Sequence, residues 1–140
     1  MQSIIKLLIA LLTLVPIGIR NDLSKVHFYP KKEEIKSYEV VHVTMYTIDP
    51  KQTDDSPTET ASGFVVDSLN PKKHRIIAVS RDLKRKLKWG QKVRVTGIGS
   101  WSGVYYVRDL MNKRFVKRID ILINPEERAI SFKKAKIYYM

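Results

Sequence analysis

The chain has 140 residues, 44% of them hydrophobic, so it is long enough for one compact domain with a buried core. It contains no cysteine, which excludes disulfides, thiolate metal sites and cysteine nucleophiles. The formal net charge of +12 favours polyanionic partners, such as nucleic acid, anionic lipid headgroups or an anionic cell-wall polymer.

The first twenty residues differ in composition from the rest of the chain. Lys6 is followed by an apolar run, Leu7–Ile19, that holds no charged residue. Such a run is short for a membrane-spanning helix but typical of the apolar region of a signal peptide. We therefore expect residues 1–20 to be a signal peptide or an N-terminal membrane anchor, with a buried core helix as the alternative. Export to the periplasm, the cell envelope or the extracellular space follows from this interpretation.

The remainder of the chain divides into a linker and a domain rich in strands. Residues 21–37 are polar and charged and are interpreted as a linker, whereas residues 38–140 hold Val, Ile, Thr and Tyr in short runs that predict strands. The predicted strands are Tyr38–Ile48, Gly63–Asp67, Arg75–Ser80, Lys92–Ile98, Gly103–Arg108, Arg118–Ile123 and Lys134–Tyr139. Short strands separated by turn residues indicate a barrel or a sandwich.

Two short helices are predicted between these strands. Ser80 is suited to cap a helix over Arg81–Leu87 by accepting a backbone hydrogen bond from the first turn. Asn124 and Pro125 are suited to begin a second helix, because Pro is favoured at the first helical position. The expected class is therefore all-β (mainly β), with one or two short helices.

Metal and cofactor motifs are missing from the sequence. His27, His42 and His74 are scattered, without the spacing of a metal site, and no phosphate-binding or dinucleotide-binding glycine motif is present. We therefore expect neither a metal nor a cofactor.

Three basic runs raise the question of nucleic acid. Lys84–Lys88, Lys113–Arg118 and Lys133–Lys136 are suited to neutralise phosphates. A basic, solvated surface explains the same pattern, and an exported protein meets little nucleic acid. Nucleic acid is therefore the less favoured partner.

Two aspartates stand among apolar strand residues near the C-terminal third of the chain. Asp109 ends one run and Asp120 lies inside the next, with ten residues between them. Cleavage of a glycosidic bond needs a carboxyl proton donor, and burial with mutual repulsion raises the pKa of one member of such a pair. The alternative is that each aspartate forms a structural ion pair with Arg108 or Arg118. The residues themselves slightly favour this alternative.

The segment between the two aspartates resembles a known signature. Asp109–Asp120 reads DLMNKRFVKRID, which is similar to DTGGAIKGNRID of the 3D domain, a family named for three aspartates. The spacing of the first and last aspartate and the Arg-Ile-Asp ending are shared. The family is related to the barrel of membrane-bound lytic transglycosylase A.

Upstream segments extend the resemblance over roughly Val43 to Ile123. They are Tyr46-Thr47, Thr60–Gly63 (TASG), Ile77–Val79 (IAV) and Trp89–Val93 (WGQKV). The chain differs from the family pattern at Ser80, where the first aspartate is expected, and at Met111-Asn112, which replace a Gly-Gly pair.

The resemblance implies a six-stranded double-psi β-barrel and a lytic transglycosylase that cleaves peptidoglycan between MurNAc and GlcNAc. Asp120 would be the catalytic acid and base, and Asp109 would tune or orient it. Residues expected along the sugar groove are Tyr46, Thr60 and Gly63, with Asp54 and Asp55 on the preceding loop. The expected partner is the peptidoglycan glycan strand, bound by a monomer. The alternatives are a non-catalytic glycan-binding module and a nucleic-acid-binding barrel.

Overall fold

A computed structural model of the chain describes residues 37–49, 51 and 56–140. All of these residues belong to one compact unit. The predicted signal peptide, nearly all of the predicted linker, and Asp54 and Asp55 lie outside the described residues.

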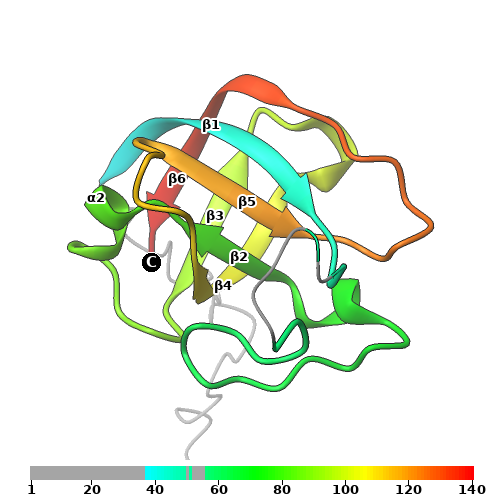
Figure 1. Cartoon of the computed structure of the whole chain (residues 1–140). Helices are drawn as coiled ribbons and strands as arrows, with labels where there is room; N and C mark the ends of the chain where they lie inside the picture. Colours follow the sequence, from blue (N-terminus) through cyan, green and yellow to red (C-terminus); the bar gives the residue numbers. More distant parts are fainter. Residues whose placement is uncertain (1–36, 50, 52–55) are drawn as a thin grey trace, which may run out of the picture. The chain divides into compact units, whose positions relative to one another are not determined.

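Six strands form a closed barrel in the order β1-β5-β2-β4-β3-β6 (Figure 1). The strands are β1 (Tyr38–Tyr46), β2 (Ile76–Val79), β3 (Lys92–Thr96), β4 (Gly103–Leu110), β5 (Arg118–Leu122) and β6 (Phe132–Tyr139). β1 pairs with β5 and β2 pairs with β4 in parallel, whereas the other four neighbouring pairs are antiparallel. The predicted mainly β class is therefore confirmed, and closure leaves no exposed sheet edge.

Six of the seven predicted strands are present, with ends shifted by a few residues. The prediction of a strand over Gly63–Asp67 is wrong, because only one isolated bridge joins Glu59 to Val65. Gly63 has a φ of +79°, a left-handed conformation that closes a tight turn instead of continuing an extended run. Two bonds hold this turn, from the Gly63 N–H to the Thr60 carbonyl (2.8 Å) and from the Thr60 N–H to the Phe64 carbonyl (2.9 Å).

The barrel interior is filled by alternate residues of every strand. Because successive strand residues point to opposite faces, residues two apart share the interior. The principal contributions come from β-branched side chains that are almost completely buried, which suits a pleated surface. The interior residues include Val41, Val43, Ile77, Val79, Val93, Val95, Val107, Ile119, Ile121 and Ile137.

A second apolar cluster lies on the outer face of the barrel wall. It joins residues of β1, β2 and β5 to the segments that follow β1 and β4. Its buried members are Tyr46, Val66, Ile76, Ala78, Met111 and Leu122, with Ile48, Phe64 and Phe115 packed against them. The two connecting segments are therefore fixed on the outside of β1, β2 and β5.

The first predicted helix is shorter than expected. α2 spans Arg81–Lys84, and two short 3-10 helices, η2 (Pro71–His74) and η3 (Gly99–Trp101), occur elsewhere. Ser80 precedes α2, but its side chain does not cap the helix. None of the helices in the described part of the chain has the length and apolar character needed to cross a bilayer.

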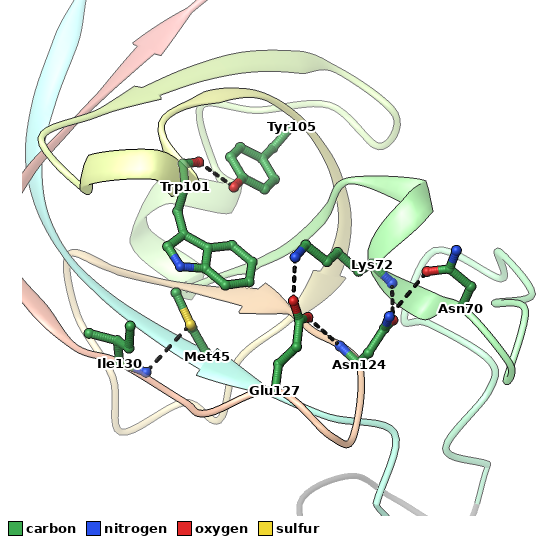
Figure 2. A network of polar contacts seen from close by, with 8 residues as sticks. All are labelled: Met45, Asn70, Lys72, Trp101, Tyr105, Asn124, Glu127 and Ile130. Atoms are coloured by element: carbon green, nitrogen blue, oxygen red, sulfur yellow. Dashed lines mark hydrogen bonds and ion pairs between the residues drawn. The ribbon is translucent and has the colours of Figure 1, made fainter.

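The second predicted helix is wrong, because the segment after Asn124 forms a turn. The Asn124 N–H donates to Oε2 of Glu127, and the Glu127 N–H donates to the Asn124 carbonyl, both over 3.0 Å. Glu127 also pairs with Lys72, whose Nζ lies 4.3 Å from the centroid of the Trp101 ring (Figure 2). These contacts tie η2, η3 and the turn after β5 together, and they hold Glu127 in the turn conformation.

Candidate functional site

Asp109 and Asp120 lie on either side of Ala78. β2 separates β4 from β5 in the barrel (Figure 1). Ala78 in β2 is the register partner of Asp109 in β4 and of Asp120 in β5. The side chain of Ala78 is a single methyl group, so it leaves space between the two carboxylates. Strand pairing therefore brings together two aspartates whose own strands are not neighbours.

Three donors hold the carboxylate of Asp109 in one orientation. The Tyr46 hydroxyl donates to Oδ2 over 2.9 Å. The backbone N–H groups of Ala61 and Leu110 both donate to Oδ1, each over 2.9 Å. Burial and the adjacent Asp109 charge raise the pKa of Tyr46 well above its usual range, so its hydroxyl remains a donor.

The turn that reaches Asp109 contains two of the residues predicted to line a sugar groove. Thr60 is buried, and its Oγ1 accepts a hydrogen bond from the Phe64 N–H (3.2 Å) and lies 3.0 Å from Oγ of Ser62. The left-handed φ of Gly63 closes the same turn. Thr60 and Gly63 therefore position the Ala61 N–H against Asp109.

Asp120 occupies a different environment from Asp109. Its Oδ1 is buried and has no hydrogen-bond partner in the described part of the chain. Burial raises the pKa of Asp120 from its ordinary value of 3.8 to about 6, and the Asp109 charge adds to this rise. The Thr44 hydroxyl, opposite Asp120 in β1, and the Arg118 charge act in the other direction but are outweighed. Asp120 is thus a carboxyl group that exchanges a proton near neutral pH.

The ion pairs considered as the structural explanation are not formed. Within residues 37–49, 51 and 56–140, neither aspartate forms an ion pair with Arg108 or Arg118. The Arg118 guanidinium donates to Nδ1 of His42 over 2.9 Å, because a guanidinium has donors only. Arg108 lies over the ring of Phe64, with Cζ 4.9 Å from its centroid. Both arginines contact other groups, and Arg118 acts on Asp120 only through its charge, so the described residues do not form the ion pairs of the structural alternative.

An open cavity of about 630 Å³ brings the two carboxylates to the surface. Its walls come from the ends of β1 and β4, the segments after these strands, α2, and the outer face of β2 and β5. It is lined by Tyr46, Pro57, Glu59, Ala78, Arg81, Asp109, Leu110, Met111, Asn112, Arg114, Phe115 and Asp120. Of the residues predicted from the sequence, Asp109, Asp120 and Tyr46 line this cavity, whereas Thr60 and Gly63 lie in the turn behind Asp109.

Three charged residues of the cavity were not singled out by the sequence analysis. Glu59 and Arg81 had no motif that marked them, and Arg114 belonged to a basic run interpreted as solvated surface. The only available signal was position, since Arg81 follows the IAVS segment and Arg114 lies between the two aspartates.

Ser80, which stands where the 3D signature has its first aspartate, is completely buried. Its N–H donates to the Arg118 carbonyl (3.0 Å) and its Oγ accepts from the Arg118 N–H (3.1 Å). Oδ2 of Asp82 accepts from the Lys117 N–H over 3.0 Å, where Lys117 has a φ of +48°. Ser80 and Asp82 therefore fix the start of β5, where Arg118 lies two positions before Asp120.

The site combines one carboxyl group that titrates near neutral pH with one carboxylate that is held by three donors. This arrangement permits general acid and base chemistry on a ligand in the cavity. No cluster of three or more histidine or acidic side chains suited to a metal ion occurs among the described residues. Comparison of the chain with protein-family models and with curated proteins found no match.

Proposed function

We propose that the protein is a lytic transglycosylase of peptidoglycan, with Asp120 as its single acid and base. The observation that carries the proposal is the state of Asp120. Its pKa is raised to about 6, its Oδ1 is buried without a partner, and its carboxyl group lines an open cavity. A general acid works best when its pKa lies close to the operating pH.

In the proposed reaction, protonated Asp120 donates its proton to the glycosidic oxygen that joins MurNAc to GlcNAc. The bond between C1 of MurNAc and that oxygen breaks, and GlcNAc leaves with a free hydroxyl. The Asp120 carboxylate then accepts the proton of the MurNAc 6-hydroxyl, whose oxygen bonds to C1 and closes a 1,6-anhydro ring. No water is consumed, and Asp120 ends protonated, ready for the next cycle.

Asp109 has a supporting role in this proposal. Its charge contributes to the raised pKa of Asp120, and its three donors keep it in one position beside Ala78. Tyr46 reaches the same cavity and is proposed to contact the sugar as well as Asp109.

The proposal extends to the family and to the finer fold. The DLMNKRFVKRID segment and the order of the YT, TASG and IAV segments support membership of the 3D family. A double-psi topology is supported by a closed six-stranded barrel with two parallel pairs, β1 with β5 and β2 with β4. Export is part of the same proposal, because the substrate lies outside the cytoplasmic membrane.

The test is digestion of purified sacculi, followed by mass spectrometry of the soluble products. The parent protein should release 1,6-anhydro-muropeptides, and Asp120→Asn should release none. Asp67→Asn is the matched control, because Asp67 pairs with Lys73 outside the lining of this cavity and should not alter the yield. Equal product from the parent and Asp120→Asn would contradict the role of Asp120.

The same experiment separates the alternatives. A non-catalytic glycan-binding module would sediment with sacculi and release no anhydro product. A nucleic-acid-binding barrel would instead retain DNA or RNA in a salt-dependent manner and would show no affinity for sacculi.

A further inference from the structure

Two arginines stand at the cavity that holds Asp120. Arg81 is the first residue of α2 and Arg114 lies in the segment between β4 and β5, and both line the cavity and are exposed. They come from chain segments more than thirty residues apart, so the fold brings two guanidinium groups to one opening.

The acidic groups of the cavity do not neutralise these arginines. Within the described part of the chain, neither Arg81 nor Arg114 forms an ion pair. The carboxylate of Asp109 is held by Tyr46 and two backbone N–H groups, and Glu59 is exposed. The guanidinium groups therefore retain donors for a ligand.

Arg114 is also oriented by its neighbours. The Cζ of its guanidinium lies 4.7 Å from the centroid of the Phe115 ring, and its backbone N–H donates to Oδ1 of Asn112 over 3.1 Å. A guanidinium stacked on an aromatic ring presents its N–H edge beside the ring, where it matches the two oxygens of a carboxylate.

We propose that Arg81 and Arg114 bind a carboxylate of the peptide stem carried by the muramyl residue. This inference rests on the proposed function and defines its substrate class as glycan strands that keep their peptide stems. The sugar rings and the amide-linked lactyl group of such a strand are neutral, so the stem supplies the negative charge. A strand stripped of its stems keeps one carboxylate, on the lactyl group. This carboxylate is the other group of the strand that the two arginines could bind.

The test compares three substrates, each with a product readout and a sedimentation readout. The substrates are intact sacculi, sacculi whose carboxylates are converted to neutral methylamides with a carbodiimide and methylamine, and strands stripped of their stems by an amidase. The proteins are the parent, Arg81→Gln, Arg114→Gln and Arg94→Gln. Arg94 is an exposed arginine of β3 outside the cavity lining, so it controls for the loss of one positive charge.

The parent should cleave methylamidated sacculi roughly tenfold more slowly than intact sacculi, since a charge-assisted pair contributes about that factor. Arg81→Gln and Arg114→Gln should each lose a similar factor on intact sacculi and should no longer respond to methylamidation. Arg94→Gln should behave as the parent. On stripped strands the parent and both variants should be equally slow.

Equal rates of the parent on intact and methylamidated sacculi would overturn the inference while the proposed function stands. Variants that lose activity only on stripped strands would also overturn it, because they identify the lactyl carboxylate as the ligand. If no protein releases product, the proposed function fails. Sedimentation then decides the inference. Carboxylate binding is supported if the parent sediments less with methylamidated sacculi than with intact sacculi, and if both cavity variants sediment less than the parent with intact sacculi. Equal sedimentation overturns the inference.

Discussion

The hydroxyl of Tyr46 donates to Oδ2 of Asp109 over 2.9 Å, although their strands are not neighbours in the barrel. Tyr46 ends β1, Asp109 lies near the end of β4, and both β5 and β2 lie between them in the sheet order. The bond therefore passes across the outer face of two strands and closes one side of the cavity beside Ala78. It fixes the position of the supporting carboxylate through a long-range contact.

Replacement of Tyr46 by Phe should lower the free energy of unfolding by about 1–3 kcal/mol, because a buried hydrogen bond to a charged acceptor is lost. Urea denaturation at neutral pH measures this change. Tyr106→Phe is the control, since Tyr106 is a partly buried tyrosine of β4 outside the cavity lining, and it should be nearly neutral. If both variants unfold at the same urea concentration as the parent, the Tyr46 bond contributes nothing to stability.

Stability should depend on pH through Asp120. Because burial raises its pKa from 3.8 in the unfolded chain to about 6 in the folded protein, the folded state binds the proton more tightly. The stabilising contribution is complete below about pH 4 and is lost as pH rises through about 6, a change of about 3 kcal/mol. Asp120→Asn does not titrate, so it should gain stability relative to the parent by up to this amount between about pH 4 and about pH 7.5.

Urea denaturation of the parent and Asp120→Asn at about pH 4 and about pH 7.5 measures how the stability difference between the two proteins changes with pH. Asp67→Asn should show the opposite sign, because the hydrogen bond from Lys73 lowers the pKa of Asp67. The contribution of Asp67 is present above the unfolded pKa and is lost as pH falls. A constant stability difference between the parent and Asp120→Asn across this range would contradict the raised pKa.

The pH dependence of catalysis should report the same group. A general acid must be protonated at the start of the cycle, so kcat/KM on sacculi should fall as pH rises through about 6. Substitution of Tyr46 by Phe leaves the burial of Asp120 in place, so the midpoint should remain within about one unit of the parent value. A rate that stays flat between about pH 5 and about pH 8 would exclude Asp120 as the group that donates the proton.

Ser80→Ala should destabilise the protein by about 1–3 kcal/mol, because the N–H of Arg118 loses its acceptor, the hydroxyl of the buried Ser80. Ser68, which is exposed, provides the matched control, and Ser68→Ala should change stability little. Thermal or urea unfolding of both variants measures the effect. Equal stability of Ser80→Ala and the parent would show that the N–H finds another partner.

Local sequence patterns predicted most of the strands and singled out the two aspartates that line the cavity. Alternation of Val, Ile and Tyr with polar residues indicates which face of each strand is buried, and this pattern needs no knowledge of the partner strand. The pattern failed at Gly63, where a left-handed residue closes a turn, and after Asn124, where Glu127 is held by Lys72. In both places a backbone conformation or a distant charge outweighs local preference.

The sequence by itself determined a mainly β domain, a basic composition and two aspartates at a fixed spacing, because these depend on residue identity and order alone. Only the tertiary structure decided that β2 lies between β4 and β5, so that Ala78 stands between Asp109 and Asp120. It also decided that Tyr46 and two backbone N–H groups hold one carboxylate, while burial raises the pKa of the other. The physical reason is that solvation and hydrogen bonding depend on residues distant in the chain, and strand order sets which residues those are.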